Sequence, residues 1–278
     1  NHRVLGWRDA SLLASGRAAD IVLGQVDSTA TVCGNGEYTA ADSLCTPMAL
    51  AVDAEGNVWV ADLLASRVLR FDRPFDEDGV ADLVLGQTDF VFDSCDRLDT
   101  SLCIPTSLAI GPTGYLYVSA YSTPDYGSFV HEFWPPFSSG MAPGRRFDNP
   151  PTTQQGFWIN FVWGLAVSSA GDLYVSVGSK GRVEVYEGGG AGSPADTGGD
   201  RVLGQADVTA AGCNRNGPAG ADTLCSPRGL ALSDDGTLYV SDQDGNRVLV
   251  YENVAAKPTG GHADAVIGQP NFGLGECN

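Results

Sequence analysis

The stretch Gly229-Leu-Ala-Leu-Ser-Asp-Asp-Gly-Thr-Leu-Tyr-Val-Ser-Asp-Gln-Asp-Gly-Asn-Arg-Val-Leu-Val-Tyr251 decides the fold of this chain. It holds three short segments in which apolar and polar residues alternate, and turn residues separate them, a pattern typical of antiparallel strands. A close copy runs from Leu50 to Phe71, and looser copies begin at Leu108 and Leu165. The matching leucines lie 58, 57 and 65 residues apart. Such self-similarity indicates a repeat architecture, in which each repeat buries its apolar face on its neighbours.

Each repeat predicts four strands. In the Leu50 copy they are expected at 48–53, 58–62, 67–71 and 81–87, and their β-branched and aromatic content suits a pleated surface. The last strand carries Val-Leu-Gly-Gln or Val-Ile-Gly-Gln, whose glutamine is expected to be a hydrogen-bonding residue of the outer strand. These glutamines are Gln25, Gln87, Gln205 and Gln269. Repeated units of four antiparallel strands predict the blades of a β-propeller, and their tight hairpin turns argue against a solenoid.

The Gly229–Tyr251 stretch resembles an NHL repeat, and the Leu50–Phe71 stretch is similar to one nearly as closely. The resemblance implies an all-β propeller in which the Leu-Ala-Val strand lines the channel and the Val-Leu-Gly-Gln strand lies outermost. We therefore predict a single NHL-like propeller domain over 1–278, with four complete blades plus a partial blade, as part of a longer repeat array. The expected parts are a partial blade at 1–26, blades at 47–88, 105–162, 163–206 and 227–270, and the start of the next repeat at 271–278.

Both ends of the chain cut through a repeat. The chain begins at the third strand of a blade and ends in a loop that leads to the next one. Unpaired strand edges are therefore expected at both ends, and such edges invite association. Two explanations remain open: further blades complete the ring, or neighbouring chains complete each other's blades end to end.

The cysteines occur in pairs in the loop that joins an outer strand to the following inner strand. This shared position predicts three local disulfides, Cys33–Cys45, Cys95–Cys103 and Cys213–Cys225, and leaves Cys277 unpaired, either free or bonded to another chain. A zinc site is disfavoured because there is no Cys-x-x-Cys and no His lies near any pair in the sequence. Disulfides persist in oxidising compartments, so we expect an extracellular, periplasmic or cell-surface protein.

The net charge of −18 excludes several classes of partner. Binding of nucleic acid or of an anionic membrane surface requires a basic face, and none is visible. No stretch is long and apolar enough for membrane insertion. A structural Ca²⁺ is the one cofactor retained, because the acidic run Asp72–Gly79 offers carboxylates without the full EF-hand spacing.

Charged residues recur at the turn between the second and third strands. Asp62 with Arg67, and Asp242 with Arg247, are predicted to form an ion pair within each blade; the alternative is a ring of charged recognition groups. The third blade has Val177 in place of the acid.

Nothing in the sequence indicates catalysis. The inner strands open with Met48-Ala49, Thr106-Ser107, Trp163-Gly164 and Arg228-Gly229, so no carboxylate is available there for a metal. The only histidines are His2, His131 and His262, and no nucleophile pattern is evident. The chain is accordingly predicted not to be an enzyme, with a metal-dependent hydrolase or lyase as the alternative.

The segment from Tyr121 to Trp163 departs most from the repeat. Aromatic residues and arginine anchor interfaces, and aromatic faces also stack on sugars, although packing of an irregular loop would need the same residues. The candidate ligand-binding residues are Tyr121, Tyr126, Trp134, Arg145, Arg146, Phe157 and Trp158. We expect a non-catalytic binding or structural scaffold that engages a protein partner or itself, with carbohydrate as the alternative ligand.

Overall fold

The computed structural model describes residues 1–9, 11, 14–36, 39–91, 95, 101–122, 127–149, 162–190 and 199–276. Over these residues the chain forms four four-stranded antiparallel sheets and one strand pair. The all-β propeller predicted from the sequence, with four complete blades plus a partial one, is confirmed. No α-helix occurs in the described ranges, which contain only the short 3₁₀ turns η2 (Cys33–Gly36), η3 (Gly178–Lys180), η4 (Glu187–Gly190), η5 (Cys213–Asn216) and η6 (Val254–Ala256).

Each blade contains four consecutive strands that pair in chain order. The partial blade is the pair β1 (Val4–Gly6) and β2 (Ile21–Leu23). The first complete blade contains β3 (Pro47–Val52), β4 (Val58–Asp62), β5 (Arg67–Phe71) and β6 (Leu83–Leu85). The second contains β7 (Cys103–Ile110), β8 (Leu116–Ser122), β9 (Gly127–Phe133) and β10 (Arg145–Asn149). The third contains β11 (Val162–Val167), β12 (Leu173–Val177), β13 (Arg182–Tyr186) and β14 (Arg201–Leu203). The fourth contains β15 (Pro227–Leu232), β16 (Leu238–Asp242), β17 (Arg247–Tyr251) and β18 (Ala265–Ile267).

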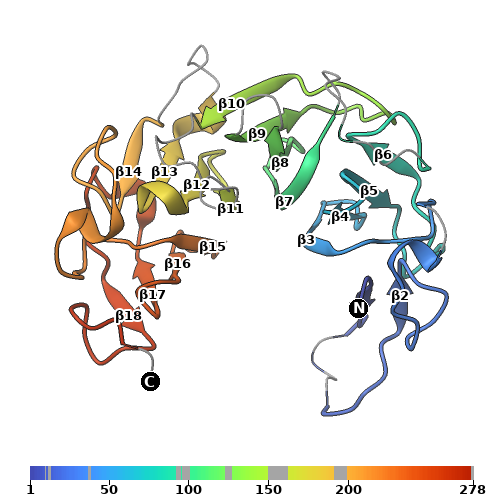
Figure 1. Cartoon of the computed structure of the whole chain (residues 1–278), viewed down its shortest axis with the longest axis horizontal. Coiled ribbons are helices and arrows are strands. Elements are labelled where there is room, and N and C mark those ends of the chain that lie inside the picture. Colours follow the sequence, from blue (N-terminus) through green and yellow to red (C-terminus); the bar gives the residue numbers. More distant parts are fainter. Residues whose placement is uncertain are drawn as a thin grey trace.

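The blades stand side by side around an arc (Figure 1). The inner strands β3, β7, β11 and β15 face the centre of the arc, and the outer strands β6, β10, β14 and β18 lie at its periphery. The arc is open between the fourth blade and the pair β1–β2, and both chain ends lie on that side.

The first three strands of the first blade agree with the sequence pattern to within one residue, and the outer strand is two residues shorter at each end than expected. The turn between β3 and β4 requires a left-handed residue, because Gly56 adopts φ = 87°, and Gly236 adopts φ = 82° in the fourth blade. Glycine reaches these angles without the steric penalty of a side chain.

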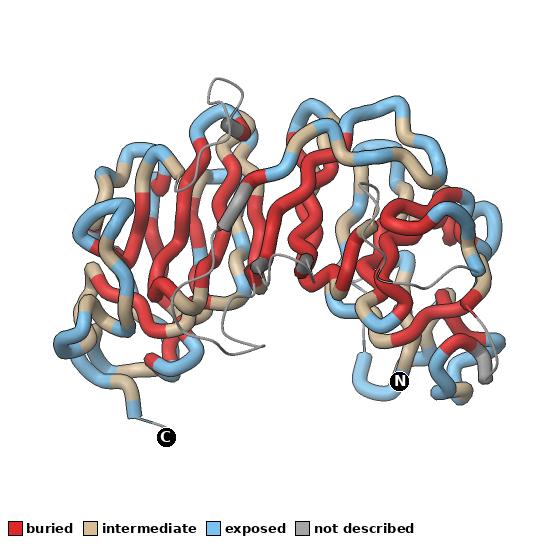
Figure 2. The backbone as a smooth tube through the Cα atoms, turned by 45° about the horizontal axis from the view of Figure 1, so that its top comes forward, coloured by how far each residue is buried: buried red, intermediate tan, exposed pale blue. Residues whose placement is uncertain are grey.

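The buried residues are concentrated in the strands of the blades (Figure 2), and the core consists of apolar clusters between neighbouring blades. Trp59 of the first blade packs in one cluster with Leu108 of the second. Tyr117 and Leu165 join the second and third blades in the same way, and the third and fourth blades share a further cluster. The strands β1 and β2 pack on the outer part of the first blade.

Covering on both faces explains why the strands of the interior blades are largely buried. All five residues of β12 are buried. In β3, by contrast, exposed and partly buried residues alternate, because no inner strand covers one of its faces. Within the described residues, no helix is long and apolar enough to span a bilayer.

Candidate functional site

The cysteine loops form the three predicted disulfides, Cys33–Cys45, Cys95–Cys103 and Cys213–Cys225. In two of the loops the second cysteine also binds the blade that follows it. The N–H of Cys45 donates to Asp62 Oδ1 at 2.5 Å, and the N–H of Cys225 donates to Asp242 Oδ1 at 2.5 Å. Each aspartate therefore connects a disulfide loop to the second strand of its blade. Cys277 lies outside the described residues.

The predicted ion pairs within the blades are confirmed. Arg67 Nε lies 3.0 Å from Asp62 Oδ2, and both side chains are fully buried. The remaining N–H groups of Arg67 donate to the carbonyls of Ser43 and Phe90, which lie in the loops on either side. Burial raises the pKa of the Asp62 carboxyl, and the charge of Arg67 opposes this shift. The pair is therefore a structural clamp, and Arg247 with Asp242 repeats it at 2.9 Å.

The third blade replaces the missing aspartate with an acid that the sequence pattern did not reveal. Glu184, two residues after Arg182 on β13, accepts from Arg182 Nε at 3.0 Å and from Lys180 Nζ at 3.2 Å. Its other oxygen accepts from the Tyr186 hydroxyl at 2.9 Å. A charged residue in the middle of a strand was the available signal, since the matching position holds Leu69 in the first blade.

The repeated glutamines are hydrogen-bonding residues, as predicted. Each donates from Nε2 to the carbonyl of the residue that precedes the third strand: Gln25 to His2, Gln87 to Ser66, Gln205 to Gly181 and Gln269 to Asn246. Three of them donate to a second carbonyl in the next loop, at Val32, Gly212 and Glu276. The glutamine therefore connects the outer strand to the turn between the second and third strands of the same blade.

One residue in the turn before the third strand of each blade lies beside the following cysteine loop, and we call this position the corner. His2, Ser66, Gly181 and Asn246 occupy it with φ between 47° and 61°. Ser66 Oγ lies 3.4 Å from Cys95 Sγ, and Asn246 Nδ2 donates to the carbonyl of Gly275.

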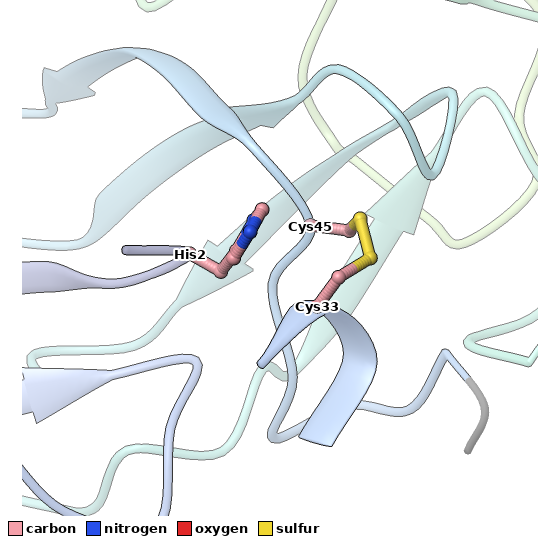
Figure 3. Close-up of side chains that lie close together, drawn as sticks. All are labelled: His2, Cys33 and Cys45. Atoms are coloured by element: carbon pink, nitrogen blue, oxygen red, sulfur yellow. A yellow bond between two sulfur atoms is a disulfide. The ribbon is translucent and has the colours of Figure 1, made fainter. Parts of the chain in front are cut away.

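At the first corner, His2 lies beside the Cys33–Cys45 disulfide (Figure 3). One ligand atom from each of the three residues lies within 4.8 Å of the others. The expectation that no histidine lies near a cysteine pair is therefore wrong in space, although it holds along the sequence. The chain separation of 31 residues between His2 and Cys33 hid this proximity.

The channel ends of the inner strands approach each other closely. A Cβ on Gly164 would lie 2.2 Å from the Arg228 carbonyl oxygen, so β11 and β15 leave room for glycine only. The preceding residue, Trp163, receives the Arg228 guanidinium 4.5 Å from its ring centroid. Thr106 Oγ1 donates to the Val162 carbonyl at 2.7 Å. Within the described part of the chain, Arg228 makes no hydrogen bond or ion pair, which leaves its N–H donors available beside the channel.

Among the described members of the aromatic segment, Tyr121 lies at one end of the β8–β9 hairpin, and Trp134, Arg145 and Arg146 lie toward the other. Tyr121 is buried on β8, at the end of the hairpin where it pairs with Ser128. Trp134 follows Phe133 at the opposite end of the same hairpin and is exposed. Arg145 and Arg146 stack on Phe147 and Phe129, at 4.4 and 4.2 Å from the ring centroids. Tyr126, Phe157 and Trp158 lie outside the described residues.

A cavity of about 410 Å³ lies where the partial blade meets the first blade, lined in part by Arg8, Arg17, Asp20 and Phe75. Its cations are paired: Arg8 contacts Asp76 at 2.9 Å and Arg17 contacts Asp20 at 3.2 Å. The cavity therefore has no cation left over for an anionic ligand.

Comparison with known proteins identifies the repeat. Residues 224–251 match the NHL repeat family model. A search of curated proteins found no match to the chain. Among solved structures, the hydrazine synthase of Kuenenia stuttgartiensis is similar with a TM-score of 0.51 and 14% identity, covering 87% of this chain and 54% of that one.

Virginiamycin B lyase of Staphylococcus aureus is similar with a TM-score of 0.48 and 13% identity, covering 84% of this chain and 58% of that one. This chain thus spans less than two thirds of the length of these proteins. At such identities, the likeness to the hydrazine synthase chain shows a shared fold and nothing about activity. The lyase match, with a TM-score below 0.5, says nothing of this chain's chemistry.

Proposed function

We propose that this chain, a propeller that carries an NHL repeat at residues 224–251, acts outside the cytoplasm as a non-catalytic binding scaffold for a protein partner. The binding surface is the inner side of the partial blade, formed by the edge of β1 and one face of β3. The occupant is a β-hairpin of the kind that forms the inner half of a blade, whether a partner or another part of the same protein provides it.

The observation that carries this proposal is the exposure of β3. Leu50 is 55% exposed, whereas Leu108 and Leu165 at the same position are each 6% exposed. Its neighbours on that face, Met48 and Val52, are also exposed. Apolar surface that is buried in every interior copy of the repeat indicates a contact surface where it is left open.

The strand β1 provides hydrogen-bonding groups next to this surface. In the other blades the third strand pairs on both sides, as β5 does with β4 and β6. Among the described residues, β1 pairs only with β2. Its other edge presents unpaired N–H and C=O groups, to which an added strand can bind by β-augmentation.

The interfaces between the interior blades indicate which kind of segment fits on the exposed face of β3. There the second inner strand carries an aromatic residue that packs with the leucine of the next blade, as Tyr117 does with Leu165. The outer half of the site is already occupied, since Leu23 of β2 packs with Leu69 and Phe71. A two-stranded hairpin with an aromatic residue on its second strand therefore fits, and a complete blade does not.

Two further observations support a scaffold outside the cytoplasm. Three disulfides are typical of a protein from an oxidising compartment. The channel-end positions carry Thr106, Trp163 and Arg228 in place of carboxylates, which disfavours the alternative of a metal-dependent hydrolase or lyase.

A synthetic hairpin peptide with the sequence Pro227–Asp242, the inner pair of the fourth blade, tests the proposal. We expect saturable binding by fluorescence anisotropy, together with slower hydrogen exchange at Val4–Gly6. Leu50→Asp should weaken binding at least tenfold, because a charge would be buried under the hairpin. Leu64→Asp, at an exposed leucine in the turn after β4, is the matched control and should bind normally. Absence of binding, or equal binding by the Leu50 variant, would rule the proposal out.

A second candidate, binding of an anionic saccharide, is favoured by the Arg228–Trp163 pair. Trp163 belongs to the aromatic segment, and the guanidinium stacked on it has N–H groups of the kind that hydrogen-bond to a carboxylate or sulfate. A glycan array should then show binding to uronic acid or sulfated glycans that Arg228→Gln abolishes. Binding unaffected by this substitution would remove the candidate.

A further inference from the structure

The corner before β1 differs from the other corners in the chemistry that it offers to its cysteine loop. His2 stands there, whereas the corners beside Cys95 and Cys213 hold Ser66 and Gly181. A Cβ on Gly181 would lie 2.6 Å from the Gly212 carbonyl oxygen, so that corner has no room for an imidazole. Only the Cys33–Cys45 loop therefore combines two sulfur atoms with a ring nitrogen among the described corners.

The geometry of this cluster is close to that of a metal site. The ligand atoms of His2, Cys33 and Cys45 lie within 4.8 Å of one another. Tetrahedral Zn²⁺, with Zn–S of about 2.3 Å and Zn–N of about 2.0 Å, places its ligands roughly 3.5–3.8 Å apart. In the oxidised chain the two sulfurs are bonded to each other, so the disulfide must open before both can bind a cation. Figure 3 shows the imidazole beside the loop that the Cys33–Cys45 disulfide closes.

The imidazole is held beside the cysteine loop by one hydrogen bond. The N–H of Thr46, the residue after Cys45, donates to His2 Nδ1 at 2.9 Å. This hydrogen bond directs a ring lone pair at the cysteine loop. The His2 carbonyl accepts from Gln25, which fixes the backbone of the corner. Cys33 is exposed, so a reductant has access to the disulfide, and Cys45 is buried.

We propose that reduction of the Cys33–Cys45 disulfide converts this cluster into a binding site for a thiophilic divalent cation such as Zn²⁺. A dithiol or phosphine reductant supplies two electrons, the S–S bond breaks, and two thiols form while the reductant is oxidised. The cation then binds both sulfurs as thiolates and releases two protons to solvent. The His2 imidazole is the third ligand, and the Nδ1 lone pair passes from the Thr46 N–H to the cation. Water takes the fourth position. Metal binding at this site therefore depends on the oxidation state of Cys33 and Cys45.

The experiment uses Co²⁺ as a spectroscopic probe of the whole chain. After anaerobic reduction with a phosphine, we expect thiolate-to-cobalt charge-transfer absorption with one Co²⁺ per chain, displaced by Zn²⁺ and absent from the oxidised protein. His2→Asn, which installs the residue of the fourth corner, should weaken Co²⁺ binding at least tenfold. Cys213→Ser with Cys225→Ser is the matched control, and it should leave the signal intact because that loop has no histidine.

A second variant avoids reduction of the other disulfides. Cys33→His leaves Cys45 as a thiol beside two imidazoles, and it should bind Co²⁺ in the oxidised chain with Cys95–Cys103 and Cys213–Cys225 intact. Adding His2→Asn to this variant should abolish that binding. The proposal is overturned if His2→Asn binds as tightly as the parent in either background, if the Cys213 control loses the signal, or if neither form binds Co²⁺.

Discussion

Single side chains hold the blades together by contacting several loops at once. Arg67 binds Asp62 and two loop carbonyls, and the side chains of Arg67 and Asp62 are fully buried. Removal of one partner from such a pair costs on the order of 3–5 kcal/mol, because a buried charge is left uncompensated. The disulfide next to it closes a loop of 12 residues, which contributes roughly 3 kcal/mol in the chain-entropy model. These local clamps stabilise loops that have little core of their own.

His131 should make the stability of the folded chain depend on pH. Its side chain is buried, Nδ1 has no hydrogen-bond partner among the described residues, and burial lowers its pKa to about 4, aided by the charge of Arg146. The unfolded chain therefore binds a proton near pH 6.5 that the folded chain binds only near pH 4. The stability that depends on the neutral, buried His131 is fully present above pH 6.5 and is lost as the pH falls toward 4.

His131→Leu should remove this dependence. The matching positions hold Leu69 and Leu249, so leucine suits the site. Urea unfolding should show that the variant gains about 2 kcal/mol relative to the wild type between pH 7 and pH 5. His262→Leu, at an exposed histidine, is the control and should leave the pH profile unchanged. A parallel pH profile for the His131 variant and the wild type would contradict the assignment.

At the scale of the strand, close approach of the inner strands sets the residue types at the channel end. The position that holds Gly164 on β11 and Gly229 on β15 precedes the repeated leucine in both blades. The two glycines have different surroundings. A Cβ at Gly164 would meet backbone of β15 at 2.2 Å, whereas one at Gly229 would meet only Ser241 Oγ at 3.3 Å.

Gly164→Ala should therefore destabilise the chain, by about 1–3 kcal/mol, because backbone must move to admit the methyl group. Gly229→Ala is the control at the matching position, where the neighbour is a small side chain, and it should cost distinctly less. The measurement is the free energy of unfolding in urea at neutral pH. Equal losses for the two variants would show that β11 and β15 do not approach as closely as described.

At the scale of the whole molecule, each blade depends on its neighbours for burial. Tyr239 on β16 is 37% exposed, whereas Tyr174 at the same position of β12 is fully buried. Ile267 on the outer strand of the fourth blade is exposed, and the matching Leu203 is buried. In a repeat protein, stability is approximately a sum over units and their interfaces, so a blade with one covered face is less stable than a blade with two.

Hydrogen exchange should reveal this gradient. We expect the amides of β12 to exchange most slowly and those of β16 to exchange faster, although the two strands have the same register and similar sequences. Mass spectrometry of peptides covering 173–177 and 238–242 measures the difference. Equal protection of the two strands would mean that an additional partner covers the fourth blade in solution.

The sequence alone determined the features that depend on nearby residues. The strands, their turns, the three disulfides and the Asp62–Arg67 pair all join groups within one hairpin or one loop, so alternation and spacing predict them. The aromatic segment remains a prediction, because Tyr126, Phe157 and Trp158 lie outside the described residues and Tyr121 lies at the opposite end of the hairpin from Trp134, Arg145 and Arg146.

Only the tertiary structure decided which equivalent residues are buried and which distant residues meet. Leu50 and Leu108 occupy the same place in the repeat, yet one is exposed, because burial depends on the neighbouring blade and a repeat does not encode that neighbour. His2 meets Cys33 and Cys45, and Arg228 meets Trp163, only when consecutive blades stand side by side. Contacts of this kind depend on the angle between sheets, which is set by packing across the whole arc.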